Sequence, residues 1–129
     1  MAPSSQSIGK TPGKESRSVS NNAEVSLKLH PEAEDELFHD AAWYDDKQSG
    51  LGDDFLAEIH RWFGIISDGP HVWPTWPNIP SAISPRVQRV VTERFPYKIA
   101  YQALPNYVLV LAVAHASREP LYWAQRLKQ

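Results

Sequence analysis

The sequence predicts a small α+β sandwich in which a helical hairpin packs on one face of an antiparallel sheet, in the order β-α-α-β-β-β. Three observations predict this fold. A short alternating stretch is followed by two amphipathic stretches with helical spacing, and three β-rich stretches end the chain. A sheet with one apolar face needs a second layer to cover it, and the helical hairpin supplies that layer.

The first strand and the first helix meet at His30-Pro31. Apolar and polar residues alternate over residues 25–29, which is typical of a half-buried strand. Pro31 suits the first turn of a helix because the N–H that it lacks would have no helical partner there. Apolar residues then recur at helical spacing until Gln48-Ser49-Gly50; they are Ala33, Leu37, Ala41 and Tyr44, with Phe38 and Ala42 expected to widen the buried stripe.

A second helix follows after a short link. Its apolar residues recur every three or four positions from Leu51 to Ile66, and Asp68-Gly69-Pro70 ends it. Two amphipathic helices with so short a link are expected to form a hairpin. The pairs Asp45-Asp46 and Asp53-Asp54 are interpreted as solvated helix ends, the second of them complementing the dipole at a helix start.

Residues 70–85 are expected to form a loop, because five prolines in sixteen positions exclude regular structure. Trp73 and Trp76 in this loop would either stack on a base or a partner, or fold back over the core. Folding back is favoured for aromatic residues in such a loop.

Three strands close the predicted fold. They are Arg86–Phe95, Tyr97–Leu104 and Tyr107–Ala114, and their β-branched and aromatic residues with prolines between them indicate an antiparallel meander. The last strand is apolar on both faces, so it is expected to lie centrally in the sheet. Trp123 is expected to pack the end of the chain back onto the core.

Composition excludes several classes of protein. The 129 residues include no cysteine, which excludes disulfides and thiolate metal sites and fits a reducing, cytoplasmic location. The sequence contains no run of about 18 apolar residues, so no membrane-spanning helix is predicted. Residues 1–23 are rich in Ser, Pro, Gly, Lys and Asn, so we expect a disordered tail before a domain over residues 24–129.

The net charge of −2 hides an asymmetry along the chain. Residues 1–85 carry six Lys and Arg against thirteen Asp and Glu, a balance of −7, whereas residues 86–129 carry seven against two, a balance of +5. A basic final third would either face phosphate or an acidic partner, or compensate the acidic part within the fold. Charge alone favours compensation.

No cofactor or metal is expected. Known metal-binding, phosphate-binding and serine-hydrolase motifs are absent from the sequence. Four of the five histidines show no ligand spacing with one another; they are His30, His39, His60 and His71.

Four stretches carry a resemblance to a known family: HPEAEDELFHDAAWYDD, GLGDDFLAEI, RFPYKIAYQ and LAVAHASREPLYWAQR. In this order they resemble the RelE/ParE family of bacterial toxins over residues 24–129, and they are most similar to its plasmid-stabilisation branch. The resemblance implies a RelE/ParE-like fold and a small cognate antitoxin that blocks the toxin. RelE-like members cut messenger RNA on the ribosome, whereas ParE-like members inhibit DNA gyrase.

The resemblance also implies candidate site residues. RelE-like ribonucleases use lysines on the first strand of the meander, an arginine on the second, and an arginine and a tyrosine near the C-terminus. When the sequence is aligned with this family pattern without gaps, Arg89 takes the place of one lysine and Lys98 that of the strand arginine. Tyr122 matches the tyrosine. Val91 and Ala116 stand where the other lysine and the late arginine are expected.

His115 is the candidate for the missing base, because imidazole titrates near neutrality. The other interpretation is a histidine at a strand end that is hydrogen-bonded to backbone. Arg118 would hold phosphate, pair with an antitoxin carboxylate, or close the fold with Glu119. The candidate catalytic set is therefore His115, Tyr122 and Arg118, and the candidate set for target or nucleic-acid binding is Arg89, Lys98 and Arg118.

Three functions remain open from the sequence. The first is a toxin that stops growth by binding a target such as DNA gyrase, which the branch resemblance and the incomplete nuclease set favour. The second is a metal-independent, ribosome-dependent endoribonuclease. The third is a detoxified relative that keeps only the partner-binding surface.

Overall fold

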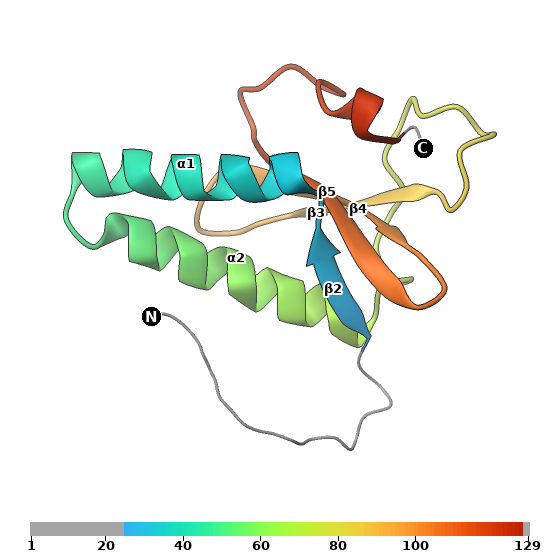
Figure 1. Ribbon diagram of the computed structural model, residues 1–129, viewed down its shortest axis with the longest axis horizontal. Coiled ribbons are helices and arrows are strands. Elements are labelled where there is room, and N and C mark those ends of the chain that lie inside the picture. Colours follow the sequence, from blue (N-terminus) through green and yellow to red (C-terminus); the bar gives the residue numbers. More distant parts are fainter. Residues whose placement is uncertain (1–24, 128–129) are drawn as a thin grey trace.

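A computed structural model describes residues 25–127 of the protein (Figure 1). The predicted tail, residues 1–23, and the outermost residues of the predicted domain lie outside the described residues. The elements in chain order are β2 (Ser26–Leu29), α1 (Pro31–Lys47), α2 (Leu51–Asp68), β3 (Val87–Val91), β4 (Tyr97–Ala103), β5 (Tyr107–His115) and the short 3-10 helix η2 (Ala124–Leu127).

The four strands form one sheet in the order β2-β5-β4-β3. β3, β4 and β5 are the predicted antiparallel meander, and β5 lies centrally as predicted. β2 pairs with β5 in parallel, with Leu27 opposite Val108, so the sheet is mixed and not wholly antiparallel. The helical hairpin connects β2 to β3 at the other edge of the sheet, and a helical connection, unlike a tight turn, can return the chain in either direction. The local sequence pattern therefore does not determine the direction of β2 relative to the other strands. The predicted α+β class is confirmed.

The helical hairpin covers one face of the sheet (Figure 1). Phe55 of α2 packs on Phe95 and Tyr97 within this core, and all three side chains are buried. The α1 stripe is narrower than predicted, because Phe38 is 53% exposed and Ala42 is also exposed. The expectation that these two residues widen the stripe is wrong; only the residues one helical turn apart face the sheet.

The loop and the C-terminal segment cover the opposite face. Trp76 and Trp123 are buried there edge to face, with ring centroids 5.0 Å apart. Trp73 instead packs on the helical side of the sheet, against Trp62 of α2, with ring centroids 5.8 Å apart. The expectation that these loop tryptophans and Trp123 belong to the core is confirmed.

β3 ends earlier than predicted. The predicted strand continues to Phe95, whereas the structure ends it at Val91. The hydroxyl of Thr92 donates to the carbonyl oxygen of Phe95 and so closes a turn before β4. A threonine in a β-rich run looks like a strand residue in the sequence, and its local hydrogen bond overrides that preference.

The turn between the helices depends on Asp45 and Gly52. The carboxylate of Asp45 accepts from the backbone N–H of Gly50 at 3.1 Å and of Gly52 at 2.9 Å, so Asp45 caps α2 and does more than solvate a helix end. A Cβ at Gly52 would lie 2.4 Å from the carbonyl oxygen of Ala41. The two helices therefore approach so closely at this point that only glycine fits.

Gly52→Ala is expected to destabilise the fold by about 1–3 kcal/mol, because the added methyl group must displace backbone. Gly64→Ala is the matched control in the same helix, since its Cβ would meet nothing within 4 Å. The control should gain roughly 0.5–1 kcal/mol from helix propensity. Urea unfolding followed by circular dichroism measures both changes. Equal stability of the two variants would contradict the close helix contact.

Candidate functional site

Arg89 and Lys98 lie side by side on neighbouring strands. Lys98 is opposite Val91, two residues beyond Arg89, so the three side chains share one face of the sheet. Val90, which alternates with them, is buried in the core under the helices, and this face therefore points away from the hairpin. Both cations line an open cavity of about 430 Å³ beside Trp73.

His115 and Arg118 join Lys98 at the end of β5. The backbone N–H of Arg118 donates to the carbonyl oxygen of His115 at 3.0 Å, which folds the chain back after the strand. The three side chains line one small cavity of about 60 Å³. The structure thus brings together four of the sequence-predicted residues, because Arg89 shares its own cavity with Lys98.

The ring of His115 is held by its neighbour Ser117. The Nδ1 atom accepts from the backbone N–H of Ser117 at 3.0 Å and lies 2.8 Å from the Ser117 hydroxyl. An accepting Nδ1 assigns the proton of the neutral ring to Nε2. In this form His115 offers a hydrogen-bond donor, which suits holding an anion better than removing a proton.

Tyr122 supports Arg118 with its ring. The guanidinium carbon of Arg118 lies 3.8 Å from the ring centroid, within the range of a cation–π contact. The Tyr122 hydroxyl is buried and has no hydrogen-bond partner among the described residues. Burial, together with the nearby Glu36 carboxylate, raises the pKa of Tyr122 to about 12. Tyr122 lines neither of the described cavities that His115 lines.

Arg126 is a residue that the sequence analysis missed. Its side chain is 5% exposed, and its guanidinium donates to Glu36 at 2.6 Å and to Glu32 at 3.2 Å. It also donates to the backbone oxygen of Leu111 in β5 at 2.8 Å. Arg126 therefore anchors the segment that carries Arg118 to both α1 and the sheet. The sequence feature that could have indicated this role is the spacing of Glu32 and Glu36, which lie one helical turn apart and so present two carboxylates on one face of the helix.

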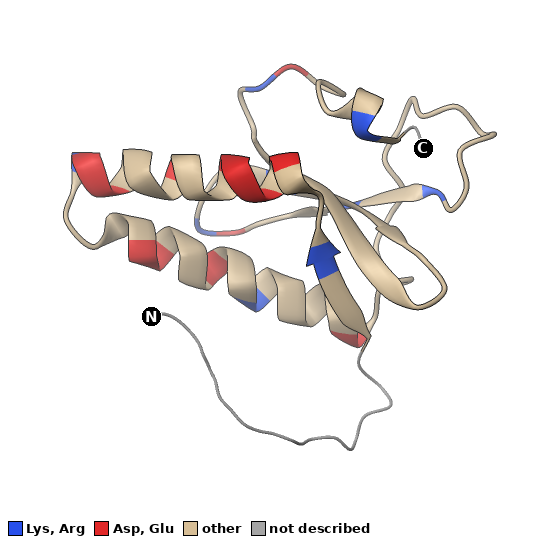
Figure 2. Ribbon diagram, in the orientation of Figure 1, with Lys and Arg blue, Asp and Glu red and all other residues tan. Residues whose placement is uncertain are grey.

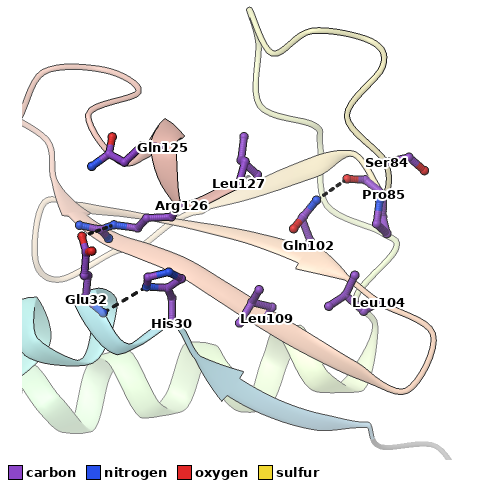
Figure 3. A pocket seen from close by; sticks show the side chains of 10 residues that line it. All are labelled: His30, Glu32, Ser84, Pro85, Gln102, Leu104, Leu109, Gln125, Arg126 and Leu127. Atoms are coloured by element: carbon purple, nitrogen blue, oxygen red, sulfur yellow. Dashed lines mark hydrogen bonds and ion pairs between the residues drawn. The ribbon is translucent and has the colours of Figure 1, made fainter. Parts of the chain in front are cut away.

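Another cavity, of about 610 Å³, lies beside Arg126 and contains none of the predicted site residues (Figure 3). Its polar groups serve the fold: the Nδ1 atom of His30 accepts from the backbone N–H of Glu32 and so caps α1, and Gln102 donates to the carbonyl oxygen of Pro85. We therefore do not assign the candidate site to this cavity.

The charged residues are unevenly distributed over the fold. Figure 2 shows most of the acidic residues on α1 and α2, whereas basic residues occur on the sheet and lie beside an acidic residue in the segment after β5. Arg89, Lys98 and Arg118 form no ion pair with another described residue. Cations without internal partners are available to bind an anionic surface.

Within residues 25–127, no group of three or more His, Cys, Asp or Glu side chains is placed to hold a metal ion. No helix of the described chain is long and apolar enough to cross a membrane.

Comparison with solved structures gives the same fold in two toxin systems. A chain of the chromosomal ParDE toxin–antitoxin system from P. aeruginosa is similar with a TM-score of 0.62 and 14% identity, over 74% of this chain and 100% of that chain. The E. coli toxin RelE, as a double arginine-to-alanine mutant in the free state, has a TM-score of 0.52 and 15% identity, over 81% and 99%. No family model and no curated protein matches the sequence. The predicted RelE/ParE-like fold is confirmed.

Arg126→Met is expected to lower the free energy of unfolding by about 3 kcal/mol, because it leaves partly buried Glu36 without its cation. Arg94→Met is the matched control, since Arg94 and its partner Asp54 are both more than half exposed and their pair should contribute little. Urea titration measures the loss, and near-ultraviolet circular dichroism reports on the packing of the aromatic side chains, Trp123 among them. A loss no larger than that of the control would contradict the anchoring role.

Proposed function

We propose that this protein is the toxin of a type II toxin–antitoxin pair and stops growth by binding a target such as DNA gyrase. The observation that carries the proposal is a surface on a RelE/ParE-like fold where Arg89, Lys98 and Arg118 have no internal ion-pair partner among the described residues. Such a target is in the cytoplasm, where a small cognate antitoxin would neutralise the toxin by covering its surface.

The arrangement of proton-transfer groups favours binding over cleavage. Metal-free RNA cleavage needs one group to take the 2′-hydroxyl proton and another to protonate the leaving oxygen. Nδ1 of His115 already accepts a hydrogen bond, and the hydroxyl of Tyr122 is buried with its pKa raised to about 12. Val91 is 57% exposed beside the cations and adds an apolar contact of the kind found in protein interfaces.

One observation supports the second candidate function, a ribosome-dependent endoribonuclease. Lys98, His115 and Arg118 line one cavity, so a phosphate and the His115 imidazole would meet there. In this alternative the Nε2–H group of His115 donates a hydrogen bond to the phosphate or to the leaving oxygen. A detoxified relative is the third candidate, and the growth experiment below separates it from both toxins.

Induced expression without the antitoxin should arrest growth, and co-expression of the small cognate antitoxin should restore it. Purified protein should lower gyrase supercoiling while translation continues. Lys98→Gln and Arg118→Gln should each weaken inhibition about tenfold by removing a charged contact of about 1.4 kcal/mol. Arg86→Gln is the control, since Arg86 is exposed and lines none of the described cavities around the candidate site.

Other outcomes identify the other candidates. Unchanged supercoiling together with message cut at the ribosomal A site would assign the endoribonuclease function. Normal growth after induction, with folded protein present, would assign the detoxified relative.

The role of Tyr122 gives an independent prediction. If its ring supports Arg118, Tyr122→Phe should keep growth arrest within about twofold, whereas Tyr122→Leu should weaken it about as much as Arg118→Gln, because a cation–π contact of about 1 kcal/mol and the stacking surface are lost. Growth after graded induction measures the effect. A strong loss of arrest in Tyr122→Phe would instead indicate that the hydroxyl acts in catalysis.

A further inference from the structure

β2 is an edge strand whose outer backbone groups have no partner strand among the described residues. It pairs with β5 on one side only, and Figure 1 shows no strand beyond it. The backbone N–H of His30 donates to the carbonyl oxygen of Val110 in β5. Alternation along the strand therefore directs the backbone groups of Val25, Leu27 and Leu29 away from the sheet. An open edge of this kind is a template for another strand.

The other edge of the sheet is covered by the chain itself. The backbone N–H of Trp76 donates to the carbonyl oxygen of Val87 at 2.7 Å, and that of Arg89 donates to the carbonyl oxygen of Pro74 at 2.9 Å. Folded proteins commonly cover or blunt the edges of their sheets, because open edges associate with other chains. The loop thus occupies the outer side of β3, whereas β2 is left available to another molecule.

An apolar groove lies beside the open edge, on the helical side of the sheet. It has a volume of about 290 Å³. Its apolar lining comes from β2 and from both helices: Leu27, Leu29, Leu37, Phe38 and Phe63. Phe38 is 53% exposed although it is a large apolar side chain. The edge and the groove together offer backbone hydrogen bonds and hydrophobic burial to the same partner.

We propose that this partner is a second copy of the chain, whose own β2 pairs antiparallel with this one, with Leu27 on the two-fold axis. This register places Leu27 opposite Leu27 and Val25 opposite Leu29, so the outward backbone groups of residues 25–29 all have partners. A two-fold axis perpendicular to the sheet keeps both helical hairpins on the same face of one continuous sheet. The two grooves then meet at the axis, and Phe38 becomes buried between the copies.

The charges of the edge fit this register. Lys28, whose Nζ atom lies 4.6 Å from the centroid of the Tyr107 ring, comes opposite the neutral Ser26 of the other copy. A register centred one residue later would place the two Lys28 side chains opposite each other, which destabilises a strand pair. Glu34 and His60 are the polar residues of each groove, so the two grooves that meet do not carry charge of one sign only. The surface is therefore complementary to itself, as a two-fold interface requires.

Sedimentation velocity of the full-length protein over a range of concentrations tests the proposal. The mass should rise from the 14.6 kDa of one chain towards twice that value as the concentration increases. Phe38→Asp should weaken dimerisation by roughly tenfold or more, as is typical for an aromatic residue at the centre of an interface. Trp43→Asp is the matched control, because Trp43 is 51% exposed on the same helix and lines a different cavity. Circular dichroism verifies that both variants are folded.

Two further variants test the strand pairing itself. Leu27→Pro removes an N–H that faces outward and leaves the donors to β5 in place, so the fold should persist while dimerisation weakens by a similar factor. Because the chain contains no cysteine, a mixture of Ser26→Cys and Lys28→Cys proteins reports on the register. Oxidation should link the two variants to each other, since their positions lie directly opposite, and Ser26→Cys alone should remain unlinked.

Three results would overturn the proposal. They are a chain that stays monomeric at every concentration, equal dimerisation of Phe38→Asp and Trp43→Asp, and a mixture of the cysteine variants that does not link. In a monomer, slow hydrogen exchange of the Leu27 and Leu29 amides would assign the edge to another segment of the same chain. The inference does not rest on the proposed function, because none of the candidate site residues lines this groove. Growth arrest is therefore independent of these measurements.

Discussion

The contacts of Arg126 hold the C-terminal segment in place, and the candidate site depends on that segment. The register of β4 and β5 skips Leu111 at a β-bulge, and the carbonyl oxygen of this residue accepts from the Arg126 guanidinium. The same guanidinium binds the carboxylates of Glu32 and Glu36 on α1. One buried cation thus satisfies a backbone group and two acidic side chains. Trp123, fully buried beside this anchor, then fixes the path of the chain that presents Arg118.

This anchor also explains the charge asymmetry of the chain. The acidic start of α1 and the basic end of the chain compensate each other through Arg126, as charge alone favours. The compensation is local, because Arg89, Lys98 and Arg118 have no ion-pair partner among the described residues. Part of the basic surface therefore serves stability, and the rest is free to meet an anionic target.

Tyr122 shows how a position that matches a catalytic residue can have a different physical role. Its ring lies between two cations, with the guanidinium carbon of Arg118 at 3.8 Å and that of Arg126 at 5.4 Å. Its hydroxyl is withdrawn from solvent, and burial raises its pKa. The ring is thus placed to orient the Arg118 guanidinium at the candidate site.

Local sequence patterns are sufficient to predict the α+β class, the two helices, the meander and the buried tryptophans, because periodicity, proline positions and apolar content are properties of short stretches. It also marked Arg89, Lys98, His115 and Arg118, which the fold brings to neighbouring cavities. The parallel pairing of β2 and the anchoring by Arg126 are seen only in the folded chain. Both depend on residues distant in the chain: Arg126 and Glu36 are 90 positions apart, and no local pattern encodes which cation is buried and which remains free.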